Sequence, residues 1–510
     1  MNELTKGKKI TLTLGPLVFI LLLALPPLPG TLHVAEVLGL SSYIFIHLSL
    51  GVLLWTAIWW VGECVPLGLA ALIPPIIFSL TGVLSWNSAL TAFTEPIIWV
   101  FMGGFALAEA FQVWGIDKRV ALKLSLIYKG NNPAIAAFFV AALPVFILTL
   151  TGSITAATSI VYPIVLAFLT SMGFGRGSKY AEATMLLVGQ ASTAGAMLLL
   201  ISTPPNLIAK KVIEDVMPGV TITFFDWFIV GTPHALIGLL IVWMVVFFVL
   251  KPEVADLAQA RERLRKEAEK LGPLSKGEKL VLLVFFITMF LWILPGSLLL
   301  LSYSAPQLSG LASTIKAILP EAAAAVIAIL LLGLIRASSR PLLTWREIEE
   351  GIDWNVVFLF GGGIALSRGL QTGGFAEWLA YIVTGVVGVK PSFWLLVTVG
   401  AILGFLITYP ASNTASTLIS APIVATLSKA AGINPVPAVI AVGLACSISS
   451  ALPSTTPPMA IVYGSRMIKL WNMFKVGMIA DSLRLILLIL LTPSLTAFLC
   501  QLKGIPLTLP

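Results

Sequence analysis

A short polar stretch between two apolar segments constrains the fold of this chain more than any other feature. It reads Thr-Tyr-Pro-Ala-Ser-Asn-Thr-Ala-Ser-Thr over residues 408–417, and the apolar runs 393–407 and 418–427 flank it. A helix needs about 20 apolar residues to cross a bilayer, so neither run can cross alone. Polar backbone at membrane depth is stable only where protein or a water-filled cavity covers it. We therefore predict a re-entrant hairpin over residues 391–430, whose two half-helices meet at Ser412-Asn413-Thr414.

The tip of such a hairpin offers two kinds of unpaired backbone group. Carbonyl oxygens are free where the first limb ends, and N–H groups are free where the second limb begins. The carbonyls suit a small cation, and the N–H groups suit an anion. The sequence therefore predicts an ion-binding site at this tip.

The same block occurs twice in the chain. Phe101 and Phe360 open two similar Gly-Gly segments that lie 259 positions apart. The same spacing relates four further pairs: Thr149 and Thr408, Ser153 and Ser412, Thr155 and Thr414, and Pro163 and Pro422. A first hairpin is thus expected over residues 132–172, and a Thr-Pro-Pro sequence follows each hairpin. Such duplication, with helices interrupted near the middle of the membrane, is typical of secondary transporters.

Composition places the chain in the membrane and excludes several functions. Hydrophobic residues make up 58% of it and charged residues 11%, whereas soluble domains carry about 25% charged residues. The three cysteines show no spacing typical of a disulfide framework or a metal cluster. We found no nucleophile paired with a base and no phosphate-binding loop, which argues against an intramembrane enzyme. The net charge of +8 is better explained by membrane topology than by nucleic acid.

Eleven apolar segments are long enough to be membrane helices. With the N-terminus in the cytoplasm, the cytoplasmic segments would hold 23 of the 31 lysines and arginines, as the positive-inside rule requires. We therefore expect a multi-pass protein of the cell membrane with its C-terminus outside. The expected helices lie at about 11–30, 41–61, 66–83, 95–113, 179–204, 227–250, 279–301, 319–335, 353–371, 434–458 and 476–500.

With these crossings the two hairpins enter the membrane from opposite faces, the first from the cytoplasm, so the second half is expected to be an inverted copy of the first. We expect an all-α protein in which 1–250 is the first inverted repeat and 280–510 the second. The charged stretch 251–279 between them has charges of alternating sign and is expected to be a cytoplasmic linker. The first repeat holds the hairpin 132–172 and a broken helix at 179–206; the second holds the hairpin 391–430 and a broken helix at 434–458.

At this point the sequence resembles the divalent anion:sodium symporters, which carry di- and tricarboxylates and in some members sulfate. Their mark is a Ser-Asn-Thr motif at each of two hairpin tips. The resemblance also covers Gly62-Glu-Cys-Val-Pro66, Phe101-Met-Gly-Gly104, Asp117-Lys-Arg119 and both Thr-Pro-Pro breaks. It implies two inverted repeats, about eleven helices with two hairpins, a homodimer, and a mobile transport domain that moves like an elevator against a scaffold.

The resemblance also implies roles for individual residues. One carboxylate of the substrate would lie at Ser412, Asn413 and Thr414, and the other at Ser153 and Thr155. The substrate would also meet the helix breaks at Thr203, Thr456 and Pro457. Sodium, the coupling ion, would bind at a first site near Thr149, Ser153 and Ser202, and at a second near Thr408, Asn413 and Thr455.

The sequence departs from this family at the first motif. Ile154 stands where the motif has asparagine, which removes a sodium ligand and a substrate donor together. Ser202, Leu199 and Met459 also replace the usual glycine, threonine and asparagine. We expect a sodium-coupled carrier of small divalent anions, in particular C4-dicarboxylates. A sodium-independent dicarboxylate exchanger and a carrier of an inorganic oxyanion such as sulfate remain alternatives.

Overall fold

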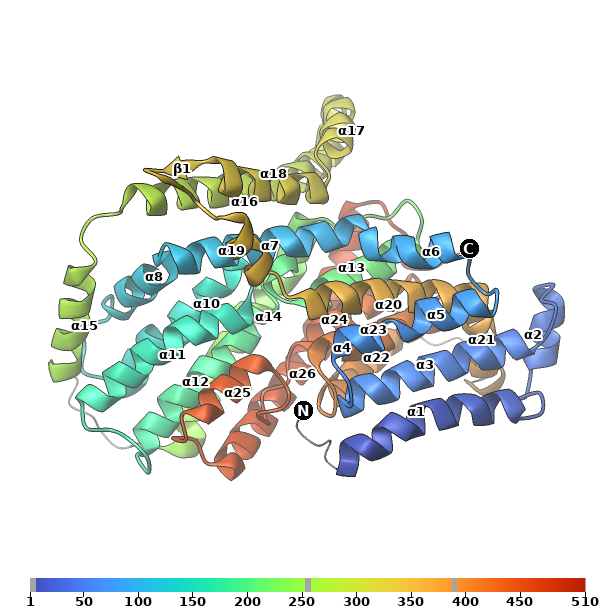
Figure 1. The fold of residues 1–510 in the computed structure, drawn as a ribbon, viewed down its shortest axis with the longest axis horizontal. Helices are drawn as coiled ribbons and strands as arrows, with labels where there is room; N and C mark the ends of the chain where they lie inside the picture. The colour runs from blue at the N-terminus through green and yellow to red at the C-terminus, as the bar shows by residue number, and fades with distance from the viewer. Residues whose placement is uncertain (1–5, 253–257, 388–391, 510) are drawn as a thin grey trace.

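The computed structural model describes residues 6–252, 258–387 and 392–509. Helices dominate these residues, and the strand content is one short antiparallel pair, β1 (Arg336–Ala337) and β2 (Arg340–Pro341). The helices lie across the molecule in a broad layer, as Figure 1 shows. The expectation of a helical membrane protein is confirmed for this part of the chain.

The helices before the charged linker have the following bounds: α1 (Lys6–Ala24), α2 (Thr31–Val37), α3 (Ile44–Gly62), α4 (Leu67–Ala70), α5 (Ile73–Leu80), α6 (Trp86–Thr91), η1 (Ala92–Thr94), α7 (Pro96–Val113), α8 (Ile116–Ser125), α9 (Pro133–Ala137), η2 (Phe138–Ala142), α10 (Leu143–Leu148), η3 (Thr149–Thr151), α11 (Ile154–Ser171), α12 (Lys179–Gly195), η4 (Leu200–Ser202), α13 (Pro204–Val216) and α14 (Phe224–Leu250).

The helices from the linker onward have the following bounds: α15 (Ala258–Lys270), α16 (Lys276–Ser304), η5 (Pro306–Leu308), α17 (Ser309–Ile318), α18 (Glu321–Leu334), α19 (Trp345–Gly351), α20 (Trp354–Thr372), α21 (Phe375–Val387), α22 (Phe393–Thr408), α23 (Asn413–Ala430), α24 (Pro435–Cys446), α25 (Pro457–Gly464) and α26 (Leu470–Leu502).

Fewer helices than expected are long and apolar enough to cross a membrane. Eight helices of the described residues meet this test, or nine if the bent pair Pro306–Ile318 and Glu321–Leu334 is one span. The segment expected at 66–83 is divided into α4 and α5, and the two broken helices are short on each side of their breaks. Prolines in the first turn of α5, α13 and α25 lack the backbone N–H that would continue the preceding helix, which explains the division.

Both predicted hairpins exist as pairs of packed helices. α10 contacts α11, and α22 contacts α23. The limbs are longer than the sequence suggested, because α11 and α23 begin directly at the tips. In the first hairpin each limb, Pro133–Thr151 and Ile154–Ser171, is apolar and long enough to span a membrane by itself. Limb length therefore does not distinguish the first hairpin from two ordinary spans.

The helix that follows each break packs against the other half of the chain. α13, which follows the first break, packs against α23 and α24 of the second half, and α25, which follows the second break, packs against α11 and α12 of the first. This reciprocal packing brings the two hairpins and the two breaks into one body.

Helix α15 forms part of the charged stretch 251–279, which we expected to be a solvated cytoplasmic linker. Its ion pairs Arg265–Glu269 and Lys270–Glu267 are largely exposed, whereas Leu264 is buried and the helix packs on α8 and α11. The linker thus has one packed face. Residues 253–257 of the expected linker lie outside the described residues, as do residues 388–391, which include the start of the second hairpin.

Candidate functional site

The first hairpin tip is a tight turn at the start of α11. Gly152 has φ +105°, a conformation that side chains disfavour, and a Cβ there would lie 3.3 Å from the carbonyl oxygen of Gly104. Ser153 follows as the N-cap of α11, and its Oγ accepts a hydrogen bond from the N–H of Ala156 at 3.1 Å. Ile154 is the first residue of the helix.

The second tip has the same construction. α22 ends at Thr408 and α23 begins at Asn413. Ser412 is the N-cap, and its Oγ accepts from the N–H of Ala415 at 3.3 Å. The predicted Ser-Asn-Thr tip therefore places free N–H groups of a helix N-terminus beside its side chains.

The two Thr-Pro-Pro sequences interrupt their helices where the sequence predicted. Thr203 and Thr456 both have extended backbone, and α13 and α25 begin at the prolines that follow. Asn206 holds the first break: its Nδ2 donates to the carbonyls of Ala196 at 2.8 Å and Leu199 at 2.7 Å. The Oγ1 of Thr456 is buried and has no hydrogen-bond partner, so it is free to meet a ligand.

One cavity of about 470 Å³ joins both tips and both breaks. It is lined by ten of the twelve residues that the sequence predicted: Ser153, Thr155, Ser202, Thr203, Ser412, Asn413, Thr414, Thr455, Thr456 and Pro457. The other two, Thr149 and Thr408, are fully buried and are not among the lining residues.

Positive potential in this cavity comes from backbone. The described residues that line the cavity include no lysine or arginine. The charged residue among them is Asp353. The N-termini of α11, α13, α23 and α25 all lie at the cavity. Since each helix N-terminus carries about half a positive charge, four of them are comparable to the charge of a dianion. The arrangement suits a small anion with two negative charges.

A cluster of oxygens lies next to the second tip. The Oδ1 of Asn413 accepts from Thr408 Oγ1 at 2.7 Å and from Ser449 Oγ at 3.0 Å. Thr408 Oγ1 is also 2.9 Å from the carbonyl oxygen of Cys446, and Thr455 Oγ1 is 3.4 Å from that of Ser449. Neutral oxygens of this kind suit a hard monovalent cation. We call Thr408, Asn413, Ser449, Thr455 and the Cys446 carbonyl the second oxygen cage.

The corresponding region at the first tip has a different composition. Ile154 is 8% exposed and offers no polar atom in place of the Asn413 amide. Thr149 Oγ1 donates to Phe146 O at 2.7 Å, and Ser202 Oγ accepts from Leu199 N at 3.3 Å. Thr455 Oγ1 in the second oxygen cage makes a local bond of the same kind, to Leu452 O at 2.7 Å. Both tips place a serine N-cap at the start of a helix, and they differ at the next residue, which is Ile154 in one and Asn413 in the other.

Sequence reasoning missed several residues of this site. Ser449 completes the second oxygen cage, and Gln112, Ser159, Asp353 and Asn355 line the cavity. The Ser-Ile-Ser-Ser sequence at 447–450, inside an apolar segment, was a signal for the first of these. The others come from helices that meet the tips only in three dimensions.

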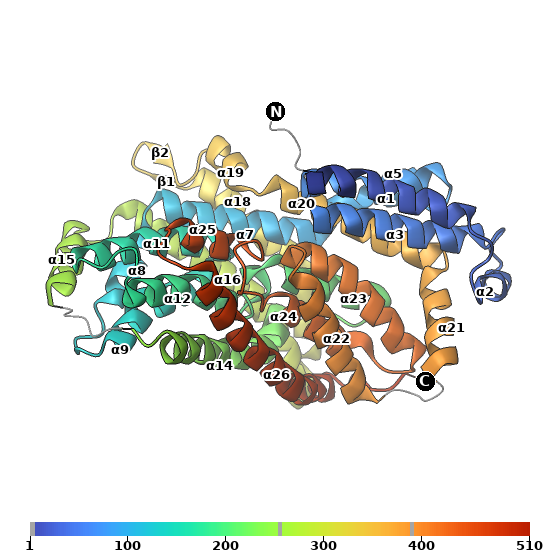
Figure 2. The same ribbon diagram turned by 90° about the horizontal axis from the view of Figure 1, so that it is seen from below.

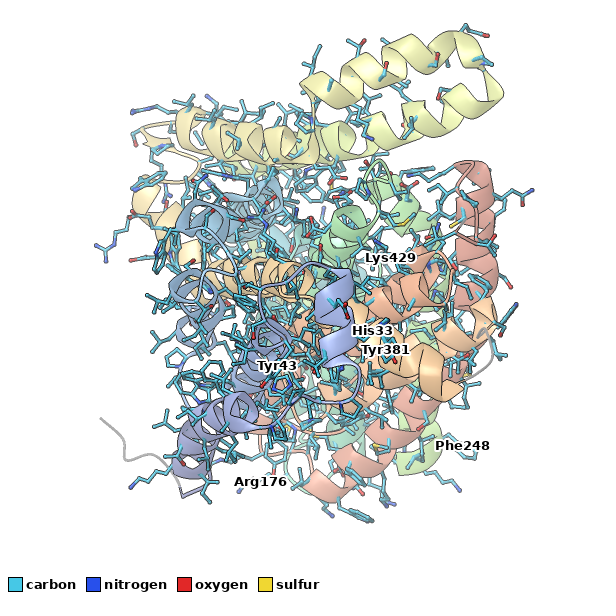
Figure 3. The ribbon with its side chains drawn as sticks, turned by 90° about the vertical axis from the view of Figure 1, so that its right-hand side faces the viewer. His33, Tyr43, Arg176, Phe248, Tyr381 and Lys429 are labelled. Atoms are coloured by element: carbon cyan, nitrogen blue, oxygen red, sulfur yellow. The ribbon has the colours of Figure 1, made fainter. Side chains whose placement is uncertain are left out.

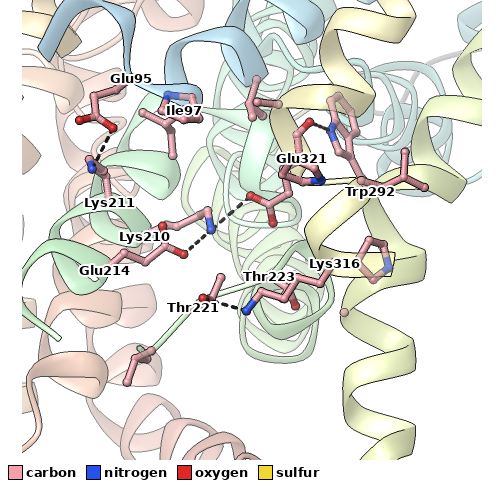
Figure 4. Close-up of a pocket in the computed structure, with 18 of the residues that line it drawn as sticks. Glu95, Ile97, Lys210, Lys211, Glu214, Thr221, Thr223, Trp292, Lys316 and Glu321 are labelled. Atoms are coloured by element: carbon pink, nitrogen blue, oxygen red, sulfur yellow. Dashed lines mark hydrogen bonds and ion pairs between the residues drawn. The ribbon is translucent and has the colours of Figure 1, made fainter. Parts of the chain in front are cut away.

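A second cavity, of about 410 Å³, is lined by many charged residues (Figure 4). Lys210 lies 2.5 Å from Glu214 and 3.2 Å from Glu321, and Lys211 lies 3.1 Å from Glu95. Lys316 donates to Thr221 Oγ1 at 3.0 Å. Because its acids are engaged by lysines, we interpret this cluster as a structural link from α13 to α18 and to Glu95, which precedes α7. Metal chemistry has no support there: the described residues contain no group of three His, Cys, Asp or Glu side chains suited to a metal ion.

Comparison with known proteins agrees with these observations. Residues 8–502 match the family described as the sodium:sulfate symporter transmembrane region. A sodium-dependent dicarboxylate transporter of Staphylococcus saprophyticus, SdcS, is 31% identical over 498 residues, which cover 95% of this chain and 90% of that protein. The protein of the same name from Staphylococcus aureus (strain USA300) is 30% identical with the same coverage.

Two solved transporter structures are similar in fold. Neisseria gonorrhoeae MtrF, from a class of antimetabolite efflux pumps, has a TM-score of 0.53 at 15% identity, with 82% of this chain and 84% of that one covered. The Alcanivorax borkumensis YdaH transporter has a TM-score of 0.50 at 16% identity, with 85% and 89% covered. These findings confirm the predicted family and exclude an enzyme. The chain belongs to the sodium:sulfate symporter family of membrane transporters.

Proposed function

We propose that this protein is a secondary active transporter of C4-dicarboxylates that is coupled to sodium. One observation carries the proposal: a single cavity receives two Ser-X-Thr hairpin tips and four helix N-termini, and an oxygen cage lies directly beside it. The names of the two staphylococcal relatives support the same substrate and the same coupling ion.

The substrate would lie between the tips. One carboxylate would accept hydrogen bonds from Ser412, Asn413 and Thr414 and from the first N–H groups of α23. The other would lie at Ser153 and Thr155, at the start of α11. Without such donors in the site, the transfer of a dianion from water into the protein would cost free energy. Thr203, Thr456 and Pro457 at the two breaks would close the sides of the site.

Sodium would bind in the second oxygen cage. Its ligands there would be the side-chain oxygens of Thr408, Asn413, Ser449 and Thr455. Asn413 would then serve both ions, since its Oδ1 faces the cage and its Nδ2 is left for the substrate. This shared residue provides a physical basis for coupling. At the first site, Thr149, Ser153 and Ser202 would form at most a weaker cage, because Ile154 supplies no ligand.

Transport requires that the cavity open to each side in turn. We propose the two inverted repeats 1–250 and 280–510, the cytoplasmic linker 251–279, and a mobile body made of the hairpins and broken helices. The reciprocal packing of α13 and α25 supports such a body. Gly351 and Asp353, which directly follow the proposed cytoplasmic segment 336–350, line the cavity, so we propose that this conformation opens to the cytoplasm.

The assembly in the membrane is also a proposal. α16 and α17 project from the body (Figures 1 and 3) and expose large apolar side chains such as Phe286, Phe290 and Leu311. Lipid or a second copy would cover them, and we propose a homodimer as the resemblance implies. Crosslinking in native membranes measures the oligomeric state directly.

The proposed topology predicts the labelling of single cysteines. The background chain would lack the native cysteines Cys64, Cys446 and Cys500, and still transport. A cysteine at residue 268, in α15, should react with an impermeant thiol reagent only from the cytoplasmic side, and one at residue 508 only from outside, because five of the eleven proposed crossings lie between these two residues. Labelling of both from one side would contradict the inverted-repeat topology.

Competition tests the proposed substrate class. Uptake of labelled succinate into proteoliposomes is expected to fall in the presence of unlabelled fumarate or malate and to change little with equal sulfate. The two tips are built for two separate carboxylates, whereas sulfate concentrates its charge at one point. Inhibition by sulfate alone would favour the oxyanion carrier. The altered first tip favours one further candidate, a sodium-independent exchanger, for which uptake would require dicarboxylate inside the vesicles.

A further inference from the structure

Helix α26 carries a buried pair of opposite charges that the substrate cavity does not use. Asp481 is 0% exposed and Arg484 is 2% exposed, and the Oδ1 of the first lies 3.5 Å from the Nη1 of the second. Neither lines the cavity between the tips. Removing two charges from water is unfavourable unless many hydrogen bonds compensate for the lost hydration. The contacts of this pair therefore indicate what it stabilises.

Asp481 holds the two chain segments that form the second oxygen cage. Its Oδ2 accepts from the hydroxyl of Tyr409 at 2.8 Å and from the N–H of Ser450 at 2.6 Å, and its Oδ1 accepts from Ser450 Oγ at 2.7 Å. Tyr409 directly follows Thr408, and Ser450 directly follows Ser449. One carboxylate thus fixes the immediate neighbours of two cage residues that come from different helices.

Arg484 binds the ends of both broken helices. Its Nη1 donates to Thr193 Oγ1 at 2.9 Å and to the carbonyl oxygen of Ile448 at 3.1 Å, and its Nη2 donates to the carbonyl oxygen of Thr193 at 2.9 Å. Thr193 lies in the last turn of α12, and Ile448 directly follows the C-cap of α24. Helix C-termini carry partial negative charge, so one guanidinium compensates two of them.

The position of α26 makes these contacts possible. The helix runs between α12 of the first half and α22 of the second (Figure 2), and it packs against α14, α22 and α24. Asp481 and Arg484 together therefore reach the second hairpin and both helix breaks.

We propose that Asp481 and Arg484 are positioning residues for the second oxygen cage, and that they set the affinity for the coupling cation without contacting the substrate. Asp481 fixes the separation of Thr408 and Ser449, whose hydroxyls converge on the Asn413 amide. Arg484 holds the carbonyl one residue before Ser449 and ties it to the end of α12. This inference rests on the proposed function, since the ion in the cage is taken to be sodium.

The test is the sodium dependence of succinate uptake by Asp481→Asn in proteoliposomes. An asparagine cannot accept all three hydrogen bonds and leaves Arg484 without its partner. We expect the sodium concentration for half-maximal uptake to rise about tenfold or more. The KM for succinate at saturating sodium should stay within about twofold, because the tips keep their own contacts. A general loss of folded protein would instead lower the maximal rate of succinate uptake, and it would do so at every sodium concentration.

A milder variant covers the case in which Asp481→Asn does not fold. Tyr409→Phe removes one hydrogen bond to Asp481 and leaves the ion pair intact, so we expect a rise of about threefold in the half-saturating sodium concentration. Thr492→Val is the matched control. Thr492 is also fully buried on α26 and bonds His234 at 3.1 Å, away from the cage, and its loss should leave the sodium dependence unchanged.

Direct ion binding separates this inference from the proposed function. For the purified wild-type protein without substrate, sodium chloride is expected to raise the melting temperature above that in choline chloride, and Tyr409→Phe should need more sodium for the same rise. A sodium-dependent wild type with unaltered sodium dependence in Tyr409→Phe and Asp481→Asn would overturn the positioning role alone. A wild type that responds equally to sodium and choline in stability and uptake would overturn the proposed coupling, and this inference with it.

Discussion

Asn413→Ala is expected to abolish succinate uptake, with a loss of at least about 100-fold. The Asn413 amide is the one side chain of the second tip that both faces the oxygen cage and borders the cavity. Its removal leaves the hydroxyls of Thr408 and Ser449 without their shared acceptor and takes a donor from the substrate. The measurement is initial-rate uptake by proteoliposomes that contain equal amounts of protein.

The control for this variant is an amide outside the site. Asn87 is exposed at the start of α6, and Asn87→Ala should transport as the parent does. Asn413→Ala should still insert and elute from a sizing column as the parent does, because one alanine at the start of α23 removes no core packing. Uptake by Asn413→Ala within about threefold of the parent would contradict the role of this residue in binding.

Ile154→Asn is expected to steepen the dependence of uptake on sodium. The wild type should show a sodium Hill coefficient of about one, because only the second cage has a full set of ligands. At the second tip, Asn413 accepts from Thr408, five residues earlier, at 2.7 Å. Residues 154 and 149 have the same spacing, so an asparagine at residue 154 is expected to restore the missing oxygen. We expect the coefficient to rise toward about two.

The matched control at this position is Ile154→Val, which keeps the site apolar and should leave the Hill coefficient unchanged. Ile154 is almost fully buried, so Ile154→Asn is compared with the parent at equal amounts of folded protein, measured by monodisperse elution. A wild-type Hill coefficient well above two would show that residue 154 is not a lost sodium ligand.

Most residues that line the cavity between the tips could be predicted, because the sequence contains each motif twice. Equal spacing between Ser153 and Ser412, and between Thr155 and Thr414, marks both tips in the amino-acid sequence alone. The Thr-Pro-Pro sequences likewise mark both breaks, since proline cannot continue the hydrogen bonds of a helix. The structure brings these four segments together around one cavity.

Contacts between distant helices could not be predicted in the same way. Ser449 joins the cage through Asn413, 36 residues away, and Asp481 reaches Ser450 across 31 residues. A hydrophobicity pattern indicates that a helix is buried but not which polar side chains will meet. Asp481 and Arg484 were visible in the sequence as charges inside an apolar helix, which is a signal of function at membrane depth, but their partners were not.

The sequence also did not show which of the expected membrane helices are interrupted, for a related reason. Apolar length suggested one helix at 66–83, yet α4 and α5 are separated at Ala71 and Leu72. There a Cβ on Gly362 of α20 would clash with the carbonyl oxygen of Ala71. The helix is thus divided where α20 approaches it closely. The sequence does not show this approach.

Concentrative uptake tests the central claim most directly. Proteoliposomes that contain the wild-type protein and no internal dicarboxylate are placed in labelled succinate, with sodium outside and choline inside. We predict that the internal concentration of succinate transiently exceeds the external concentration. This excess should disappear when sodium is equal on both sides or when Asn413→Ala replaces the wild type. Succinate that only equilibrates, at the same rate with and without the sodium gradient, would contradict sodium-coupled transport through this cavity.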